Sequence, residues 1–401
     1  MEFRRWRGFC LCSLGGAFPS DAVPTEAPFD PLVLLTDRPP ETSRGLFAVR
    51  TVDEAMSEGV SALVPAAPVD VPKELRTAVE RWGATVLNTA FRRAFDCLTA
   101  ERKTDGLRLT LVGLGDVGGT LLTVCGCFRE LRIYDPNEAL CRRYELELNQ
   151  VLSPDGTPLP RVTICPTAEL FDCDLFLFAA SRGVPPVGAA VRDVRMEQFA
   201  RNREMLNAYA RRAREEGFLG LFCQISDPVD LLCRAAFSES NRNAGGVFDA
   251  NGLLPEQIRG FGLGVMAARA AYYAEKTGVD FTHGRVYGPH GADLIVANHP
   301  QDYDAALSQR LTEQTVTANL RVRELGFKPY IAPALSSAAV SLLRLLRGEP
   351  CYSAVSLGGA YFGCTSRTTE KGVLTEREPL HPALFERIEE VYRRLEAFCY
   401  D

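Results

Sequence analysis

The sequence predicts an α/β protein built around a doubly wound parallel sheet. Short strand-like runs at 109–112, 130–134 and 175–178 alternate with longer segments whose apolar residues have helical spacing. This alternation is typical of parallel strand–helix–strand units. The run at 109–112 also passes directly into a glycine-rich turn, which is how the first unit of such a sheet often begins.

Three glycines of this turn follow the pattern G-x-G-x-x-G. Gly113 is expected to form the turn, Gly115 to let a diphosphate approach the backbone, and Gly118 to let the helix cross the strand closely. Free N–H groups at the helix N-terminus would then favour phosphates. Asp135 ends the next strand, where a carboxylate accepts hydrogen bonds from ribose hydroxyls and repels a 2′-phosphate. The pattern therefore predicts NAD binding; a glycine-rich turn without a ligand is the competing interpretation.

Composition narrows the class of protein. At 401 residues the chain is long enough for about two or three domains. Its net charge is −6 and it has no sustained basic run, which argues against nucleic acid as a main partner. No apolar stretch approaches the roughly 18 residues of a membrane span, so no membrane partner is expected. The 13 cysteines lack paired metal-ligand spacing, which predicts buried thiols in a reducing, cytoplasmic compartment.

Residues 107–365 resemble the NAD-dependent lactate/malate dehydrogenase family. Several landmarks carry the resemblance in one order: Gly113-Leu-Gly-Asp-Val-Gly-Gly119, Asp135, Glu145-Leu-Glu-Leu-Asn149, Gln198-Phe-Ala-Arg-Asn202, Ser226-Asp-Pro-Val-Asp230 and Gly288-Pro-His-Gly291. The resemblance implies a Rossmann-type domain followed by an α+β domain, and hydride transfer between NAD(H) and a 2-hydroxy or 2-oxo acid. It also implies a small-molecule substrate with a carboxylate, and a homodimer or homotetramer.

The expected organisation has four parts: a flexible leader (1–27), a small α/β extension of unknown role (28–104), an NAD-binding domain (105–250) and a catalytic and oligomerisation domain (251–401). Only the last two belong to the part of the chain that the family covers. The resemblance implies that NAD is bound by Gly113, Leu114, Gly115, Asp116, Val117, Gly118, Asp135, Ala180 and Ser226.

The resemblance also assigns the chemistry. His290 matches the proton-transfer histidine of the family, and Arg269, on a helix expected over 256–276, matches the arginine that grips the substrate carboxylate. Arg195 matches the loop arginine that polarises the substrate carbonyl, and Arg192 lies close enough in sequence to reach the substrate as well. Without the resemblance, these would be an ordinary histidine and arginines of solvated helix faces.

Two positions depart from the family. Met266 stands where the family has an aspartate that orients the histidine, and Asp227 stands where it has an asparagine that contacts substrate. Asp227, or Asp293 three residues after His290, could replace the missing acid. Alternatively, Asp227 favours a substrate with an amine or several hydroxyls, or the chain is a catalytically silent NAD-binding sensor or scaffold.

Substrate identity and metal chemistry stay less defined. The position that usually distinguishes lactate from malate dehydrogenases falls near Ala189, a small apolar residue that selects neither substrate.

Metal-dependent glycosidases share this fold, but they would need a cysteine and a histidine as metal ligands. Pro289 precedes His290 and no cysteine is near it in sequence, so no metal site is expected.

Overall fold

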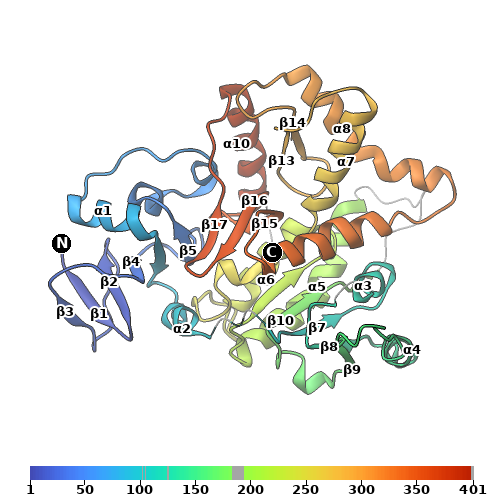
Figure 1. The fold of residues 1–401 in the computed structure, drawn as a ribbon, viewed down its shortest axis with the longest axis horizontal. Coiled ribbons are helices and arrows are strands. Elements are labelled where there is room, and N and C mark those ends of the chain that lie inside the picture. Colours follow the sequence, from blue (N-terminus) through green and yellow to red (C-terminus); the bar gives the residue numbers. More distant parts are fainter. Residues whose placement is uncertain (102, 104, 124–125, 183–193, 399–401) are drawn as a thin grey trace.

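The computed structural model describes residues 1–398 except 102, 104, 124, 125 and 183–193, and for 194 and 195 it describes the backbone only. Within these residues, 15 strands form one continuous sheet with the order β3-β1-β2-β4-β6-β5-β17-β16-β15-β12-β11-β10-β7-β8-β9. Figure 1 shows the N-terminal strands at one side, an antiparallel hairpin in the centre and the remaining strands at the other side. Two further strands, β13 and β14, pair separately.

Six parallel strands form the part of the sheet that positions the site. In spatial order they are β12 (Ile258–Gly260), β11 (Leu221–Gln224), β10 (Leu175–Phe178), β7 (Arg108–Val112), β8 (Glu130–Tyr134) and β9 (Arg161–Ile164). The strand order reverses between β7 and β10, whose ends are in register at Val112 and Phe178. Ligands of doubly wound sheets bind outside the carboxyl ends at such a reversal. The predicted α/β, Rossmann-type fold class is confirmed.

Helices cover both faces of these strands. On one face, Phe176 and Phe178 of β10 pack in the core formed with α5 (Val194–Glu215) and α6 (Val229–Ser240). On the other face, Leu109 and Leu111 of β7 pack with side chains of α3 (Asp116–Leu122), α4 (Glu138–Leu148) and α9 (Ser341–Leu346). Successive side chains of a strand point to opposite faces, so these apolar runs supply both cores.

The second half of the chain continues this sheet and adds a helical layer. Its elements are α7 (Leu263–Lys276), β13 (Arg285–Tyr287), β14 (Ile295–Ala297), α8 (Ala305–Glu324), the π-helix η5 (Pro333–Val340), α9, β15 (Cys351–Ser356), β16 (Tyr361–Thr369), β17 (Gly372–Thr375) and α10 (Pro382–Glu396). The prediction of a helix from residue 256 is wrong, because 258–260 pair with β11 and the helix begins only at Leu263. No helix among the described residues combines the length and apolar content needed to cross a bilayer.

The N-terminal region is ordered. Its elements are β1 (Phe3–Trp6), β2 (Phe9–Ser13), β3 (Val23–Thr25), β4 (Leu32–Thr36), β5 (Leu46–Val49), the 3-10 turns η1 (Val52–Met56) and η2 (Gly59–Leu63), α1 (Lys73–Trp82), β6 (Ala84–Asn88) and α2 (Ala94–Thr99). The prediction of a flexible leader over 1–27 is wrong, because β1 pairs with β2 and β3 and its end residues Phe3 and Trp6 are buried. The division into domains stays a prediction.

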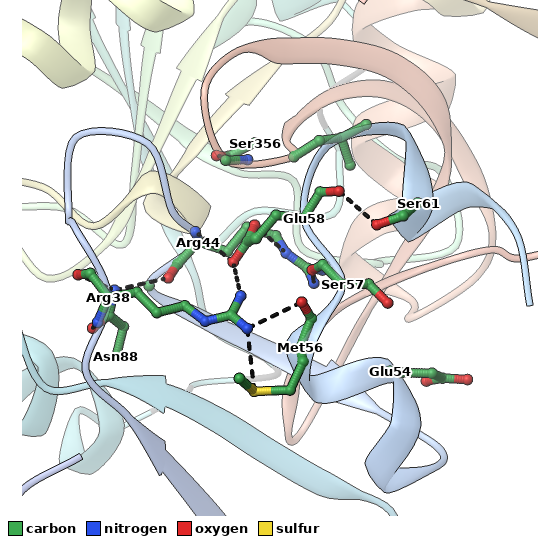
Figure 2. A network of polar contacts seen from close by, with 12 residues as sticks. Arg38, Arg44, Glu54, Met56, Ser57, Glu58, Ser61, Asn88 and Ser356 are labelled. Carbon is green, nitrogen blue, oxygen red and sulfur yellow. Dashed lines mark hydrogen bonds and ion pairs between the residues drawn. The ribbon is translucent and has the colours of Figure 1, made fainter. Parts of the chain in front are cut away.

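Backbone and side-chain contacts join this region to the rest of the molecule. β5 pairs in parallel with β17, where Phe47 faces Val373. The buried carboxylate of Glu256 accepts hydrogen bonds from the backbone N–H groups of Gly45 and Leu46, at 3.0 and 2.8 Å. The β5–β17 pairing and the bonds to Glu256 make the extension continuous with the sheet rather than an appended tail. Within the extension, Figure 2 shows Arg38 and Arg44 of the loop before β5 converging on Glu58, at 3.0 and 3.2 Å.

Candidate active site

The glycine turn after β7 is packed tightly on two sides and open on a third. Gly113 has a φ of +96°, and a Cβ there would lie 2.4 Å from the backbone N of Ala180. A Cβ on Gly118 would lie 1.9 Å from the carbonyl O of Gly113, so this residue allows α3 to cross the strand. A Cβ on Gly115 would meet no protein atom within 4 Å. The backbone at Gly115 is therefore open to solvent on this side, which is what a diphosphate-binding turn requires.

Asp135 lies directly beside this turn. Its Oδ2 accepts a hydrogen bond from the backbone N of Leu114 at 2.9 Å, and its Oδ1 accepts one from the backbone N of Asn137 at 2.9 Å. Since an ionised carboxylate has about four acceptor positions, capacity remains for two ribose hydroxyls. The open backbone at Gly115 and this carboxylate together fit the adenosine diphosphate half of NAD.

The remaining predicted cofactor residues surround the same turn. Asp116 and Val117 begin α3, and Asp116 forms an exposed ion pair with Lys328 at 3.1 Å. The hydroxyl of Ser226, after β11, donates to the carbonyl of Ala180, after β10, at 2.5 Å. This bond holds the loops that follow the two neighbouring strands together, on the side of the sheet where the glycine turn lies.

His290 and Asp227 come together at this edge. The Nδ1 atom of His290 lies 3.6 Å from Oδ1 of Asp227, a charge contact that is longer than a hydrogen bond. The imidazole is 17% exposed and the carboxylate 48% exposed. A Cβ on Gly262 would lie 2.6 Å from Nδ1 of His290, so this glycine allows the ring to pack against the start of α7.

Asp230 is a member of this site that the sequence reasoning did not single out. Its side chain is 3% exposed, and its Oδ2 accepts a hydrogen bond from the backbone N of His290 at 2.9 Å. It therefore fixes the loop that carries the histidine. Its place in the run 226–230, already recognised as a landmark, was the available signal.

Arg269 lies on α7 close to the same carboxylate. Burial lowers the pKa of its guanidinium, while the nearby Tyr273 and Asp227 act in the opposite direction. An arginine keeps its charge at neutral pH despite such a shift. Its Nη1 lies 3.8 Å from the sulfur of Met266, which is 3% exposed and packs in the apolar cluster of α7, β13 and β14. A neutral thioether thus stands where the resemblance implies a carboxylate.

The other candidates do not join this cluster in the described structure. Asp293 pairs with Arg394 at 3.1 Å rather than with His290. Arg195 lies in the first turn of α5, where only the backbone is described, and Arg192 and Ala189 lie outside the described residues. Among the residues that the structure describes, no group of three histidine, cysteine or acidic side chains could hold a metal ion.

Curated relatives match about half of the chain, although no protein-family model matches it. The chain is 29% identical over 197 residues to an L-lactate dehydrogenase of Treponema denticola, covering 47% of this chain and 56% of that protein. It is 24% identical over 195 residues to an L-lactate dehydrogenase of Mycoplasmopsis pulmonis, covering 47% and 57%. The matches thus span a little over half the length of these relatives.

Solved structures with the same fold cover more of the chain. Malate dehydrogenase from Plasmodium falciparum has a TM-score of 0.58 at 17% identity, covering 73% of this chain and 96% of that one. The minor L-lactate dehydrogenase of Enterococcus mundtii has a TM-score of 0.59 at 19% identity, covering 74% and 98%. A malate dehydrogenase from Archaeoglobus fulgidus in complex with NADH has a TM-score of 0.58 at 15% identity. About a quarter of this chain lies outside these likenesses.

Proposed function

Because this chain is a divergent member of the lactate/malate dehydrogenase family, we propose that it transfers a hydride between NAD(H) and a 2-hydroxy or 2-oxo acid in a modified active site. The observation that carries the proposal is the convergence of His290, Asp227 and Arg269 at the edge where the glycine turn lies. A proton-transfer group, an orienting carboxylate and a carboxylate-binding cation are what such a reaction requires of the protein.

NAD supplies the hydride acceptor or donor when it is bound. The residues that would hold it are those of the glycine turn, with Asp135 at the ribose and Ala180 and Ser226 along the crevice. The open backbone at Gly115 and the remaining acceptor capacity of Asp135 support this assignment. The carboxylate of Asp135 would also repel the 2′-phosphate of NADP.

The histidine would move the substrate proton. Asp227 faces Nδ1 of His290, so it would favour the tautomer that protonates Nδ1 and leaves Nε2 as the base. Nε2 would then take the proton of the substrate hydroxyl during oxidation and return it during reduction. Asp230 would position the histidine through its backbone, and Arg269 would bind the substrate carboxylate. Arg195 and Arg192, which precede or begin α5, are proposed to approach the carbonyl and carboxylate of the substrate.

The test is a pair of measurements on the same preparations of wild type and His290→Ala. NADH affinity is measured by fluorescence titration, with NADPH as the control for the role of Asp135. Turnover of NADH is then followed with a panel of 2-oxo acids. We expect both proteins to bind NADH and only the wild type to reduce an acid. NADH binding without reduction of any acid by the wild type would overturn the proposal.

A catalytically silent NAD-binding sensor or scaffold is the second candidate, and Met266 is the observation that favours it. Losing the orienting carboxylate of the comparable serine-protease triad costs on the order of 10⁴ in rate. If Asp227 does not compensate, cofactor binding would persist without turnover. Following the reduction of NAD⁺ by amino acids and polyols also tests whether the carboxylate of Asp227 selects a substrate with an amine or several hydroxyls.

We also propose self-association and a reducing, cytoplasmic compartment. Large apolar side chains are exposed on α8 and the segment after it, among them Leu325 at 74%, Phe327 at 70% and Ile331 at 59%. An exposed apolar patch of this kind marks an interface in many proteins. Light scattering after size-exclusion chromatography tests for the expected homodimer or homotetramer.

All eleven cysteines that the structure describes are free thiols, which supports the proposed reducing compartment.

A further inference from the structure

A cavity of about 610 Å³ lies at the edge of the sheet opposite the glycine turn. Leu107, Leu175 and Leu221 stand at the amino ends of β7, β10 and β11 and form part of its wall. Cys97 of the N-terminal extension and Val373 of β17 form other parts. Gly113 follows Leu107 by six positions, with β7 between them, so the two sites are roughly 20 Å apart. The wall is mainly apolar and combines the N-terminal extension with the Rossmann strands.

Arg259 of β12 lines this cavity and is fully buried. It is in register with Cys223 of β11, and its Nη2 donates a hydrogen bond to the hydroxyl of Ser366 at 3.1 Å. Its Nε and Nη1 make no hydrogen bond within the described structure. No ion pair with a carboxylate is found for this guanidinium among the described residues.

The charged groups around Arg259 do not neutralise it. The carboxylate of Glu256 is held by the backbone of Gly45 and Leu46, and burial raises its pKa to about 7. Asp174 pairs with Lys103 at 2.9 Å, and Glu216 pairs with Arg212. Glu101 is exposed at the cavity rim.

The neighbouring Cys351 thiol does not neutralise Arg259 either. Burial raises the pKa of the Cys351 thiol even beside Arg259, so this sulfur stays protonated and neutral at physiological pH. Removing an unpaired charge from water is costly, and buried charges in proteins are paired with an opposite charge. Among the described residues, no anionic group therefore pairs with Arg259.

We propose that this cavity is a second binding site, which takes a monocarboxylic acid with an unbranched apolar chain. The carboxylate would lie against the free nitrogens of Arg259, and the chain would lie along Leu107, Leu175, Leu221 and Leu346. The combination of one buried cation with an apolar wall favours such a ligand over an inorganic anion, which would leave the wall uncovered. The proposal is independent of the proposed activity.

Calorimetric titration of the full chain with octanoate, below its micelle concentration, tests the site. Octan-1-ol has the same chain without the charge, and inorganic phosphate has the charge without the chain. We expect saturable octanoate binding, with octan-1-ol and phosphate at least tenfold weaker. Decanoate should bind about 16-fold more tightly, since each added methylene contributes roughly fourfold. An absence of saturable octanoate binding, or equal binding of octanoate and octan-1-ol, would overturn the proposal.

Three variants locate the ligand. Arg259→Met should lose the preference for octanoate over octan-1-ol, while Arg393→Met, at a 70% exposed side chain of α10, should keep it. Leu346 is a half-buried residue of the cavity wall, and Leu346→Trp places a larger side chain in the cavity without changing a charge. This variant should abolish octanoate binding, and it tests the site even if Arg259→Met does not fold. Retained preference in Arg259→Met, or retained affinity in Leu346→Trp, contradicts the site. Octanoate should leave NADH affinity unchanged. Competition between octanoate and NADH would instead show that octanoate binds at the glycine turn, which contradicts the proposal. An absence of NADH binding would contradict only the proposed function.

Discussion

The Nδ1 atom of His290 lies 3.6 Å from a carboxylate oxygen of Asp227, in a site where Met266 stands at the position for which the resemblance implies an orienting acid. Asp227 comes from the loop after β11, whereas residue 266 belongs to α7. The acidic group that faces the histidine therefore comes from a different element than the one the resemblance implies. Because Asp227 is 48% exposed, solvent weakens its interaction with the imidazole.

Asp227→Asn separates the two roles considered for this carboxylate. If Asp227 orients His290, the variant should lose about 100-fold in kcat, since positioned proton transfer contributes about 10² to 10⁴. Steady-state turnover of NADH with the best 2-oxo acid measures this. The fold should be unaffected, because Asn202 bonds the backbone carbonyl of residue 227 and not its side chain. A gain in turnover would contradict the role, since asparagine is the family's residue here.

Arg269→Lys tests carboxylate binding. Lysine keeps the positive charge but loses the planar pair of donors, so KM for the acid should rise by about 10- to 100-fold, as expected for one lost charged hydrogen bond. The effect on kcat should be much smaller. Kinetics with the acid and with its methyl ester provide the comparison, because the ester should respond little to the substitution. An unchanged KM for the acid would remove Arg269 from the site.

The glycine turn allows a matched pair of substitutions. Gly115→Ala adds a methyl group that meets no protein atom, so the melting temperature should stay unchanged while NADH affinity falls by about tenfold or more. Gly118→Ala places its methyl group 1.9 Å from the carbonyl of Gly113, so the melting temperature itself should fall.

Gly126→Ala, with open space around it, is the control for both variants. Thermal unfolding and NADH titration on the three proteins give the answer. If Gly115→Ala binds NADH as tightly as the wild type, the diphosphate does not approach this turn.

Glu256 should make stability depend on pH. Burial raises its pKa from 4.5 to about 7, while Arg44 and the N–H groups of Gly45 and Leu46 act against that rise. The folded state holds the proton of Glu256 more tightly than the unfolded state, so protonation of this side chain stabilises the fold. This stabilisation is complete below about pH 4.5 and is lost as the pH rises to about 7. Over that range the free energy of unfolding should fall by about 3 kcal/mol.

Glu256→Gln should remove this dependence, since an amide does not titrate. Urea unfolding of both proteins from pH 5 to pH 8 measures it. The stability of the wild type relative to the variant should decrease across this range, and a constant difference would contradict the shifted pKa.

The parallel sheet was predictable because its strands are continuous apolar runs that alternate with helices. Much of the N-terminal sheet was not. Strand β1 has two consecutive arginines between buried Phe3 and Trp6, so it lacks an alternating pattern, and its position close to a Pro- and Ala-containing segment resembles a leader. Strand β12 was hidden for a similar reason, since it has three residues and its centre is Arg259. A strand this short is defined by its neighbours in the sheet and not by its own pattern.

The candidate site was predictable residue by residue only where the family's landmarks persist. His290 and Asp227 lie far apart in sequence, and only the fold brings their side chains to a distance of 3.6 Å. Asp293 is closer to His290 in sequence but pairs with Arg394 of α10. Spacing alone cannot distinguish these two acids, because both outcomes depend on packing between distant elements.

The pairing of β5 with β17 has a consequence for synthesis of the chain. Phe47 is made more than 300 residues before Val373, its partner in the sheet. While the ribosome completes the intervening residues, β5 has a neighbour only on its β6 side, so its other backbone edge is available to any extended strand. Polypeptides that end before β17 would keep that edge permanently, and chains released early are therefore the ones most prone to associate with one another.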